Sequence, residues 1–385
     1  MRSEAPEAEG RPVAGGQDAG AEAQSQAEEV RRLTEAVSRH FTVADVRYES
    51  GVLTYRVQEQ EVKRPFKALY REVWRAGYVP TVERDELGVR IRFFRAPRFP
   101  ERRSLVPLAL LALTAVTTFV DGYLRSIEAE RVFGPPLDSA VFNAAVYTVA
   151  LLAIVGVHEL GHKLSARIDG IDTSLPYFIP GIPGSIPTFG AVIFQRSPVV
   201  NRDDLFDLGV SGPVAGFAVA LVVTAYSFQT AAWLPTEEVM RLVQEGRVGA
   251  LRAPLVFDVF AAIFGQGREG LVPIFPTVVF AAWLGMVVTA LNLLPIWQLD
   301  GGRIFRSFLS RRGHLIASYA SVAVLMLTGY FFFAILLLLL MRNPVDVTVL
   351  DNVSRLSRWR KAAMVGVMAM LVMTYVVVQP LLPLP

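Results

Sequence analysis

Long apolar runs that begin at Ser104 constrain this chain more than any other feature of its sequence. A helix needs about 20 apolar residues to cross the hydrocarbon core of a bilayer. Six segments meet that requirement: 105–127, 139–166, 207–230, 274–296, 314–341 and 362–379. The sequence therefore predicts a polytopic α-helical membrane protein with about six transmembrane helices, integral to the lipid bilayer and multi-pass.

The fifth of these segments is long for a single span. At 1.5 Å per residue, a helix over 314–341 would reach about 42 Å, against a hydrocarbon core of about 30 Å. We therefore expect this segment to be tilted or to be broken near Thr328-Gly329.

Two segments of different composition precede the first span. Residues 1–30 contain Ala, Gly, Glu and Gln with almost no large side chain, which predicts a disordered acidic tail. Residues 31–98 predict a small soluble α+β domain, with strands within 41–58 and 88–94 and a helix over 64–78. His40 follows a charged helix, so a surface or capping role is expected.

The sequence HELGH, residues 158–162, ends the second apolar segment. Residues four apart on a helix share a face, so the imidazoles of His158 and His162 can reach one tetrahedral Zn²⁺. Glu159 is placed to take a proton from a water that such a metal activates. Ionisable residues at membrane depth are costly unless they are paired or bind a metal, which favours a functional site over a helix end that emerges into water.

A zinc ion on two histidines needs a third protein ligand, and the chain has no cysteine to supply it. Asp300 is the favoured candidate, because Pro295 ends the preceding span and Gly301-Gly302 permit a tight turn toward the pocket. Other acids compete for the role and are otherwise expected to be interfacial or helix-capping residues. They are Asp121, Asp203, Asp204 and Asp207.

Two further stretches suit close packing around such a site. Small residues at the start of the third span predict tight contact with the histidine-bearing helix, whose own Gly161 is also small. They are Ser211, Gly212, Ala215 and Gly216. Residues 171–200 are apolar but rich in Pro and Gly, which excludes a helix and predicts a re-entrant hairpin. Its end, 189–195, alternates like a strand, and a free strand edge there could pair with an extended substrate; an ordinary interfacial loop is the alternative.

Three motifs therefore occur in order: HELGH in an apolar span, GVSGPVAGF at 209–217, and NLLPIWQLDGGRI at 292–304. Together they resemble the site-2 proteases, intramembrane zinc metalloproteases of the M50 type, over about residues 105–310. The soluble front end and the absence of an inserted PDZ module or CBS pair make the chain similar to the EGY-like branch of archaea, cyanobacteria and chloroplasts.

The resemblance implies one Zn²⁺ per chain on His158, His162 and Asp300, with Glu159 as general base. It also implies that Asn292 lies near the scissile carbonyl and donates to the oxyanion; a hydrogen bond between helices is the alternative for this residue. Residues 104–380 would then form an intramembrane metalloprotease domain, with its zinc core at about 139–302. The implied partner is a transmembrane protein substrate.

Other classes of protein remain open at this point. The main alternative is a catalytically silent zinc-binding membrane scaffold, although such a scaffold has no need of Glu159 as a base. A zinc transporter would need acidic or histidine side chains along a path, whereas the spans supply essentially one cluster. The basic residues are scattered and give no nucleic-acid patch.

Charge predicts the orientation in the membrane. Six Lys or Arg residues lie within the fifteen positions before the first span, which predicts a cytosolic N-terminal domain in a cell membrane. HELGH and the basic segment 301–313 would then lie near the cytosolic face. The basic loop 342–361 disagrees, because six simple spans would place it outside. His314, at the start of a span, is expected to be interfacial.

Overall fold

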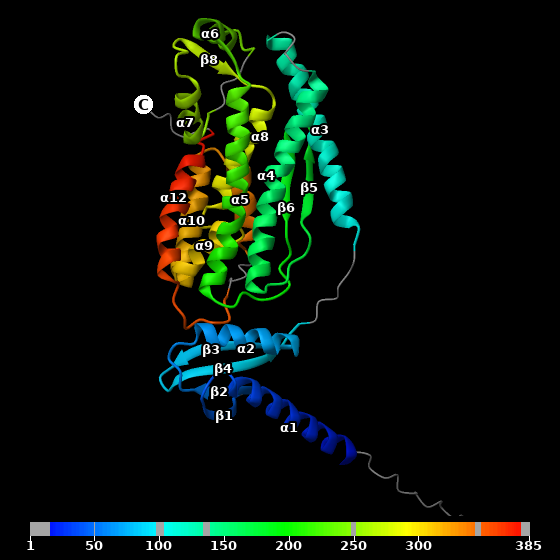
Figure 1. Cartoon of the computed structure of the whole chain (residues 1–385), viewed down its shortest axis with the longest axis vertical. Coiled ribbons are helices and arrows are strands. Elements are labelled where there is room, and N and C mark those ends of the chain that lie inside the picture. Colours follow the sequence, from blue (N-terminus) through cyan, green and yellow to red (C-terminus); the bar gives the residue numbers. More distant parts are fainter. Residues whose placement is uncertain are drawn as a thin grey trace, which may run out of the picture. The chain divides into compact units, whose positions relative to one another are not determined.

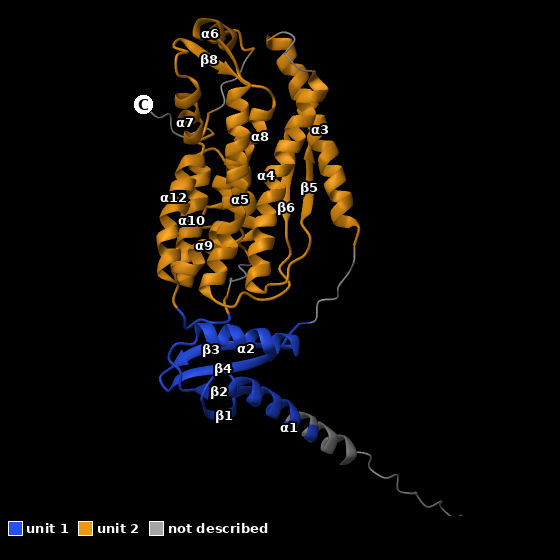
Figure 2. Cartoon of the chain, viewed as in Figure 1, with its two compact units in different colours: residues 1–98, 350–354 blue, residues 99–349, 355–385 orange. Residues whose placement is uncertain are grey.

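A computed structural model of the chain describes residues 16–49, 51–97, 104–133, 139–247, 252–342 and 348–378. The chain divides into two compact units, which Figure 2 colours separately. Unit 1 comprises residues 1–98 and 350–354, and unit 2 comprises residues 99–349 and 355–385. The sequence did not predict that residues 350–354 join unit 1.

Unit 1 is a four-stranded antiparallel sheet with two helices (Figure 1), and its strand order is β1-β2-β4-β3. Its elements are α1 (Gly16–Ser38), β1 (Val43–Glu49), β2 (Val52–Val57), α2 (Lys63–Arg75), β3 (Tyr78–Asp85) and β4 (Gly88–Arg95). Alternate apolar residues of β2 and β4 are buried, and so are the apolar residues on one side of α2. These side chains pack together into one hydrophobic core. The core includes Leu53, Tyr55, Val57, Val89, Ile91, Phe93, Phe66, Leu69 and Val73.

The N-terminal segment differs from its prediction. Residues 16–30, expected in a disordered tail, lie in α1, because Ala, Glu and Gln favour helix and the helix continues to the buried Leu33 and Val37. Residues 1–15 of that tail lie outside the described residues. His40 is partly buried, and its Nε2 lies 3.0 Å from a carboxylate oxygen of Glu72 on α2.

Residues 350–354 add to the free edge of the sheet at β3. The N–H of Val82 donates to the carbonyl oxygen of Leu350 at 2.9 Å, and the N–H of Asn352 donates to the carbonyl oxygen of Val82 at 3.3 Å. The added segment runs parallel to β3. Asp351 is fully buried, and its Oδ1 accepts from the N–H groups of the two residues that follow Asn352. Unit 1 is thus built from two segments far apart in the sequence.

Unit 2 is mostly helical. Its helices are α3 (Val106–Phe133), α4 (Ala140–Asp169), α5 (Arg202–Gln229), α6 (Thr236–Gln244), α7 (Leu255–Phe264), α8 (Val278–Asn292), α9 (Asp300–Phe308), α10 (Arg311–Leu327), α11 (Phe331–Leu340) and α12 (Arg358–Thr374). Its strands are β5 (Tyr177–Ile182), β6 (Ile186–Val192), β7 (Ala232–Pro235) and β8 (Leu271–Ile274). By length and composition α3, α4 and α5 can cross a membrane, and α7, α8 and α11 are shorter apolar helices.

The segment 314–341 is broken, one of the two alternatives that its length predicted. α10 ends at Leu327 and α11 begins at Phe331, with Gly329 between them at φ 94°, a conformation that glycine adopts without strain. The two helices share a core that includes Leu325 and Leu337. The count of six spans stays a prediction.

Residues 171–200 contain a β hairpin. β5 pairs antiparallel with β6, and both strands contact α3 (Figure 1). Gly184 makes the turn at φ 82°, and a Cβ on Gly181 would lie 2.0 Å from the carbonyl oxygen of Ile186. The predicted strand 189–195 is correct only in its first half, because β6 ends at Val192. Re-entry of the hairpin into the bilayer stays a prediction.

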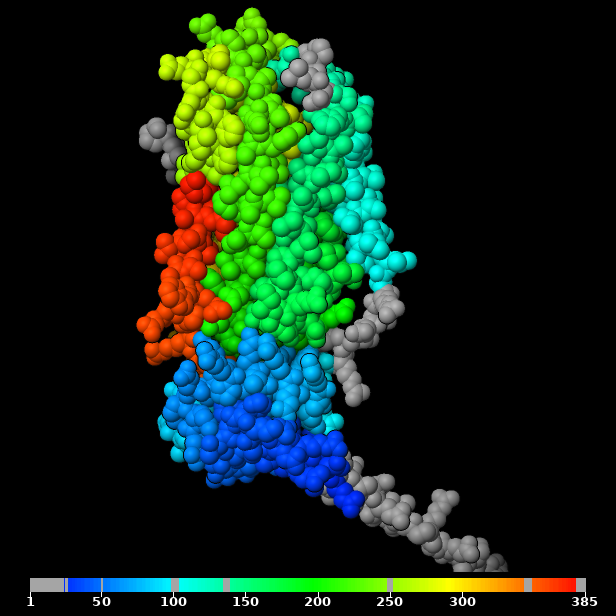
Figure 3. All heavy atoms as spheres, viewed as in Figure 1, coloured from blue at the N-terminus to red at the C-terminus, as the bar shows by residue number. Residues whose placement is uncertain are grey.

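The centre of unit 2 is the contact between α4, α5 and α8. α4 and α5 lie side by side on the visible face of unit 2 in Figure 3. A cluster of buried side chains joins the three helices, and its members include Tyr147, Leu151, Ile154, Ala220 and Met286. This shared cluster packs the three helices against one another.

Candidate metal centre

α4 carries the first two candidate ligands on one buried face. The helix is capped by Ser139, whose Oγ accepts from the N–H of Phe142, and it ends at Gly170 in the left-handed conformation. His158 and His162 lie one turn apart, and each is only 7% exposed, as is Glu159. An unbroken helix is what fixes the relation between the two rings.

Asp300 reaches the same place from the first turn of α9. α8 ends at Asn292, before Pro295, and the chain turns back in the seven residues that follow. Gly301 and Gly302 make this turn possible: a Cβ on Gly301 would lie 2.2 Å from a backbone carbonyl oxygen, and one on Gly302 would lie 2.3 Å from another. The Gly301-Gly302 pair noted in the sequence is therefore required sterically, because any side chain at either position would strike a backbone carbonyl.

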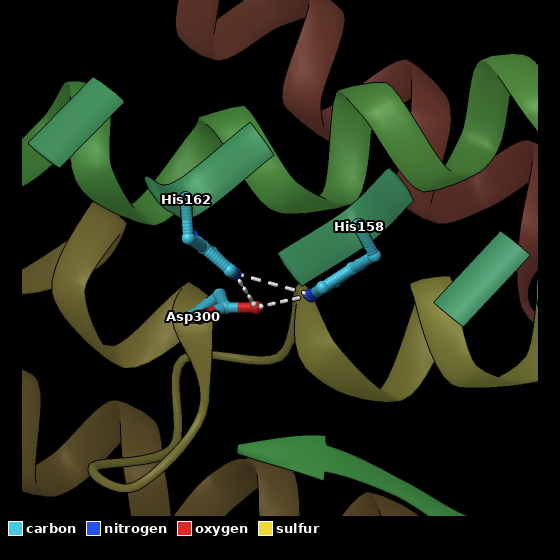
Figure 4. A group of neighbouring side chains, drawn as sticks. All are labelled: His158, His162 and Asp300. Atoms are coloured by element: carbon cyan, nitrogen blue, oxygen red, sulfur yellow. Dashed lines mark hydrogen bonds and ion pairs between the residues drawn. The ribbon is translucent and has the colours of Figure 1, made fainter. Parts of the chain in front are cut away.

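The three side chains converge on one point (Figure 4). Asp300 Oδ2 lies 3.1 Å from His158 Nε2 and 3.1 Å from His162 Nε2, and the two Nε2 atoms are 3.1 Å apart. Ligands of a tetrahedral zinc ion at 2.0–2.1 Å are separated by about 3.3 Å. The spacing of the three donors therefore fits one face of such a tetrahedron.

The hydrogen bond of His162 supports the same conclusion. Its Nδ1 lies 2.7 Å from the carbonyl oxygen of Leu208, which can only accept, so Nδ1 carries the proton. In a neutral imidazole, the form that binds a metal, Nε2 then presents a lone pair toward the carboxylate of Asp300. Two electron-rich atoms in contact repel each other unless a cation lies between them, so this donor set fits a metal ion.

The glycines of α5 make room for the imidazole rings. A Cβ on Gly212 would lie 2.1 Å from His162 Nε2, and one on Gly216 would lie 3.1 Å from His158 Cβ. Gly161 of α4 likewise packs closely on α5. A Cβ on Gly161 would lie 2.5 Å from the carbonyl oxygen of Ser211 and 2.9 Å from Ala215 Cβ. The small-residue face predicted for the third span thus lies against the metal-binding helix.

Asp121 does not join this cluster. It is fully buried and accepts from Arg125 Nε, Tyr147 Oη and the N–H of Gly184, each at 2.8 Å, while its expected interfacial position stays a prediction. One carboxylate therefore links α3, α4 and the turn between β5 and β6. This role was missed because its three partners come from separate parts of the sequence.

The other competing acids lie at the start of α5. Asn201, not an aspartate, caps the helix, and its side-chain oxygen accepts from the N–H groups of Asp203 and Asp204. Asp203 and Asp207 bind Arg360 of α12 instead. Asn201 therefore caps α5 in place of these aspartates, and their expected interfacial position stays a prediction.

His314 and Asn292 lie outside the three-ligand cluster. His314 is 1% exposed and stacks on Trp297 with ring centroids 5.4 Å apart, so it is covered by protein; its interfacial depth in the membrane stays a prediction. Asn292 is the partly buried last residue of α8, and its contact with a substrate stays a prediction. Within the parts of the chain that the structure describes, His158, His162 and Asp300 are the only group of His, Asp or Glu side chains placed to share a metal.

The sequence matches a known family over the segment that holds this cluster. Residues 146–337 match the family described as peptidase family M50. They include both histidines, Glu159 and Asp300, and this region of the chain belongs to that family. The resemblance inferred from the three motifs is confirmed.

Several relatives carry zinc metalloprotease names. The chain is 33% identical over 216 residues, 54% of its length and 38% of the relative's, to "Probable zinc metalloprotease EGY2, chloroplastic" of Oryza sativa subsp. indica. It is 29% identical over 259 residues, 64% of its length and 44% of the relative's, to the Arabidopsis thaliana protein of that name. It is 30% identical over 231 residues, 58% and 40% of the two lengths, to "Probable zinc metalloprotease EGY1, chloroplastic" of Arabidopsis thaliana.

The chain spans about two fifths of the length of these curated relatives. No solved structure gives a significant match to it. The zinc cofactor and the metalloprotease class predicted from the sequence agree with the family and with the names of the relatives. The names place those relatives in the chloroplast, so the predicted cell-membrane location gains no support from them.

Proposed function

We propose that this chain is an intramembrane zinc metalloprotease that hydrolyses a peptide bond in or near a transmembrane segment of another membrane protein. The observation that carries the proposal is the convergence of His158, His162 and Asp300 at 3.1 Å within a region of peptidase family M50. The two histidines belong to a helix long and apolar enough to cross a membrane. The bilayer is therefore the proposed surrounding of the site.

Each residue of the site has a separate task. His158, His162 and Asp300 would hold one Zn²⁺, which would supply a Lewis acid that makes water acidic enough to ionise near neutral pH. Glu159 accepts the proton of the attacking water and returns it to the leaving amine. Asn292 donates its side-chain N–H to the carbonyl oxygen of the scissile bond, where negative charge develops.

The hairpin of β5 and β6 supports a way to present the substrate. A transmembrane helix must unwind before a peptide bond within it can be attacked, and an extended chain can pair with a strand edge. Gly156 of α4, less than one turn before His158, lies close to the hairpin, because a Cβ there would be 3.7 Å from the ring of Phe178. Phe189 of β6 is 56% exposed. We infer that β6 binds the unwound substrate beside the metal.

The pairing of residues 350–352 with β3 supports an orientation. Because residues 350–354 belong to unit 1, we propose that they lie on the same side of the membrane as the N-terminal domain. The break between α10 and α11 lets the chain return to that side. The basic loop 342–361 and the basic residues before α3 then both agree with the positive-inside rule, which places Lys and Arg on the cytosolic side. This agreement supports a cytosolic N-terminal domain.

Glu159→Gln tests the proposal. The variant should retain zinc, since Glu159 is not one of the proposed metal ligands, but should lose cleavage of a membrane-protein reporter that the parent cuts in the same vesicles. A photoreactive residue at Phe189 should cross-link to the reporter in this inactive variant. Cleavage by Glu159→Gln at the parent's rate contradicts the proposal; a zinc-loaded parent that cuts no membrane reporter favours a silent scaffold.

A further inference from the structure

α12 is tied to the start of α5 by one arginine. Arg360 Nε donates to Asp207 Oδ1 at 2.8 Å, its Nη2 donates to Asp207 Oδ2, and its Nη1 donates to Asp203 Oδ2 at 3.0 Å. Figure 3 shows α12, in red, alongside α5, in green. A guanidinium that binds both oxygens of one carboxylate fixes the direction of the contact as well as its length.

The tie holds from both sides. Asp203 Oδ1 accepts the N–H of Ser357, the residue that precedes α12, at 2.9 Å, so the same acid holds the entry to α12 as well as Arg360. The side chains of Arg360 and Asp203 are 31% and 12% exposed, which leaves this contact less open to screening than a surface ion pair. Each helix therefore restrains the first turns of the other.

Asp207 directly precedes the residue that orients a metal ligand. The carbonyl oxygen of Leu208 accepts the Nδ1–H of His162 and thereby turns Nε2 toward Asp300. The carbonyl oxygen of Leu208 also accepts from Ser211 Oγ, within α5, at 3.2 Å. Its direction is therefore set by the place of the first turns of α5, which Asp203 and Asp207 join to Arg360.

The segment before α12 is itself anchored. Leu356 is 6% exposed and belongs to a buried cluster with Phe206 of α5 and Ile304 of α9, the helix that carries Asp300. Residues 350–354, just upstream, are part of unit 1. Arg360 is thus placed between the anchored segment and the α5 turn that contacts His162.

We propose that Arg360 is a positioning residue of the metal centre. It holds the first turns of α5 so that the Leu208 carbonyl keeps His162 in the tautomer and direction that bind a metal. Its hydrogen bonds go to Asp203, Asp207 and Ser357, not to the proposed metal ligands. The inference rests on the proposed function only in requiring a metal at His158, His162 and Asp300.

The test measures metal binding rather than proteolysis. A chromogenic chelator is added to the zinc-loaded full chain in detergent, and the rate of zinc loss is measured. The proteins compared are the parent, Arg360→Ala, Arg360→Lys and Arg358→Ala. Arg358 is the matched control, because it is an exposed arginine at the start of the same helix. Removal of a group that supports a metal-bound histidine costs about 10–100-fold in affinity, so a more distant group should cost less. We expect zinc loss about three- to tenfold faster in Arg360→Ala, intermediate in Arg360→Lys and unchanged in Arg358→Ala.

A double-mutant cycle and a spectrum separate positioning from general destabilisation. Arg360→Ala and Asp207→Ala should not be additive, so the double variant should lose zinc no faster than the faster single variant. The visible spectrum of the Co²⁺-substituted protein should change in Arg360→Ala, because the geometry at His162 changes. If Arg360→Ala is not monodisperse, Arg360→Lys decides the question.

The outcomes are distinct. Parent-like zinc loss and an unchanged cobalt spectrum in a folded Arg360 variant overturn this inference and leave the proposed function standing. Additive effects of the Arg360 and Asp207 changes also overturn it. A parent that binds no zinc overturns the proposed function together with this inference.

Discussion

Gly212→Ala should remove the metal from this protein while leaving its helices intact. A Cβ at this position would lie 2.1 Å from His162 Nε2, the atom proposed to bind zinc, and 2.5 Å from both ring carbons beside it. Ordinary contact begins at 3.4 Å, so the ring or α5 must shift by roughly 1.3 Å. Metal–ligand distances tolerate only about 0.2 Å. The required shift is therefore several times larger than the change in metal–ligand distance that zinc coordination tolerates.

Two other glycines supply a graded series. A Cβ on Gly216 would lie 3.1 Å from His158 Cβ, a contact that a movement of a few tenths of an ångström relieves. A Cβ on Gly156, just before the HELGH motif, would meet only a ring carbon at 3.7 Å. Alanine favours helix by about 1 kcal/mol over glycine at all three sites, so propensity cannot explain a difference among them.

The assay is bound zinc per chain, measured by elemental analysis on detergent-purified protein that elutes as a single species. We expect near-parent zinc in Gly156→Ala, weakened binding in Gly216→Ala and little or no zinc in Gly212→Ala. Cleavage activity should follow the same order. A Gly212→Ala protein that holds one zinc with parent affinity would refute the geometry of the site.

Three further predictions concern other parts of the chain. Asp121→Asn should lower the free energy of unfolding by about 2–3 kcal/mol in thermal denaturation, because Arg125 loses its buried carboxylate partner. Hydrogen bonds from Arg56 hold the pKa of Asp85 below its usual 3.8. The stabilisation from this pair is therefore present above about pH 4 and is lost as the pH falls through the lowered pKa, so the unfolding midpoints of parent and Asp85→Asn should converge in acid. Asp351→Ala should speed amide hydrogen exchange at the edge of β3, with little change in β2, since two hydrogen bonds that shape the added segment disappear.

The local part of the metal site could be predicted from the sequence. His158, Glu159 and His162 lie within five residues of one helix, so the spacing alone gives their arrangement. Asp300 is far along the chain, and physical reasoning left other acids in competition until the family resemblance was considered. The structure shows why Asp300 is suited: two glycines let the chain turn where any side chain would strike a backbone carbonyl.

The roles that sequence reasoning missed all depend on partners from distant segments. Asp121, Asp203 and Asp207 look alike in sequence, yet one joins a hairpin turn to α3 and the others bind an arginine more than 150 residues away. The addition of residues 350–354 to the sheet of unit 1 has no local signal, because a free strand edge accepts many sequences. Hydrophobic periodicity predicts which face of an element is buried, but it does not predict which other segment packs against that face.

The central claim, a zinc site on His158, His162 and Asp300, is tested most directly by counting metal. The purified parent, His162→Ala, Asp300→Ala and Glu159→Gln should be analysed for zinc in parallel. We expect about one zinc per chain in the parent and in Glu159→Gln, and loss of zinc in the other two variants. Full zinc in folded Asp300→Ala, or none in a folded and freshly purified parent, would contradict it.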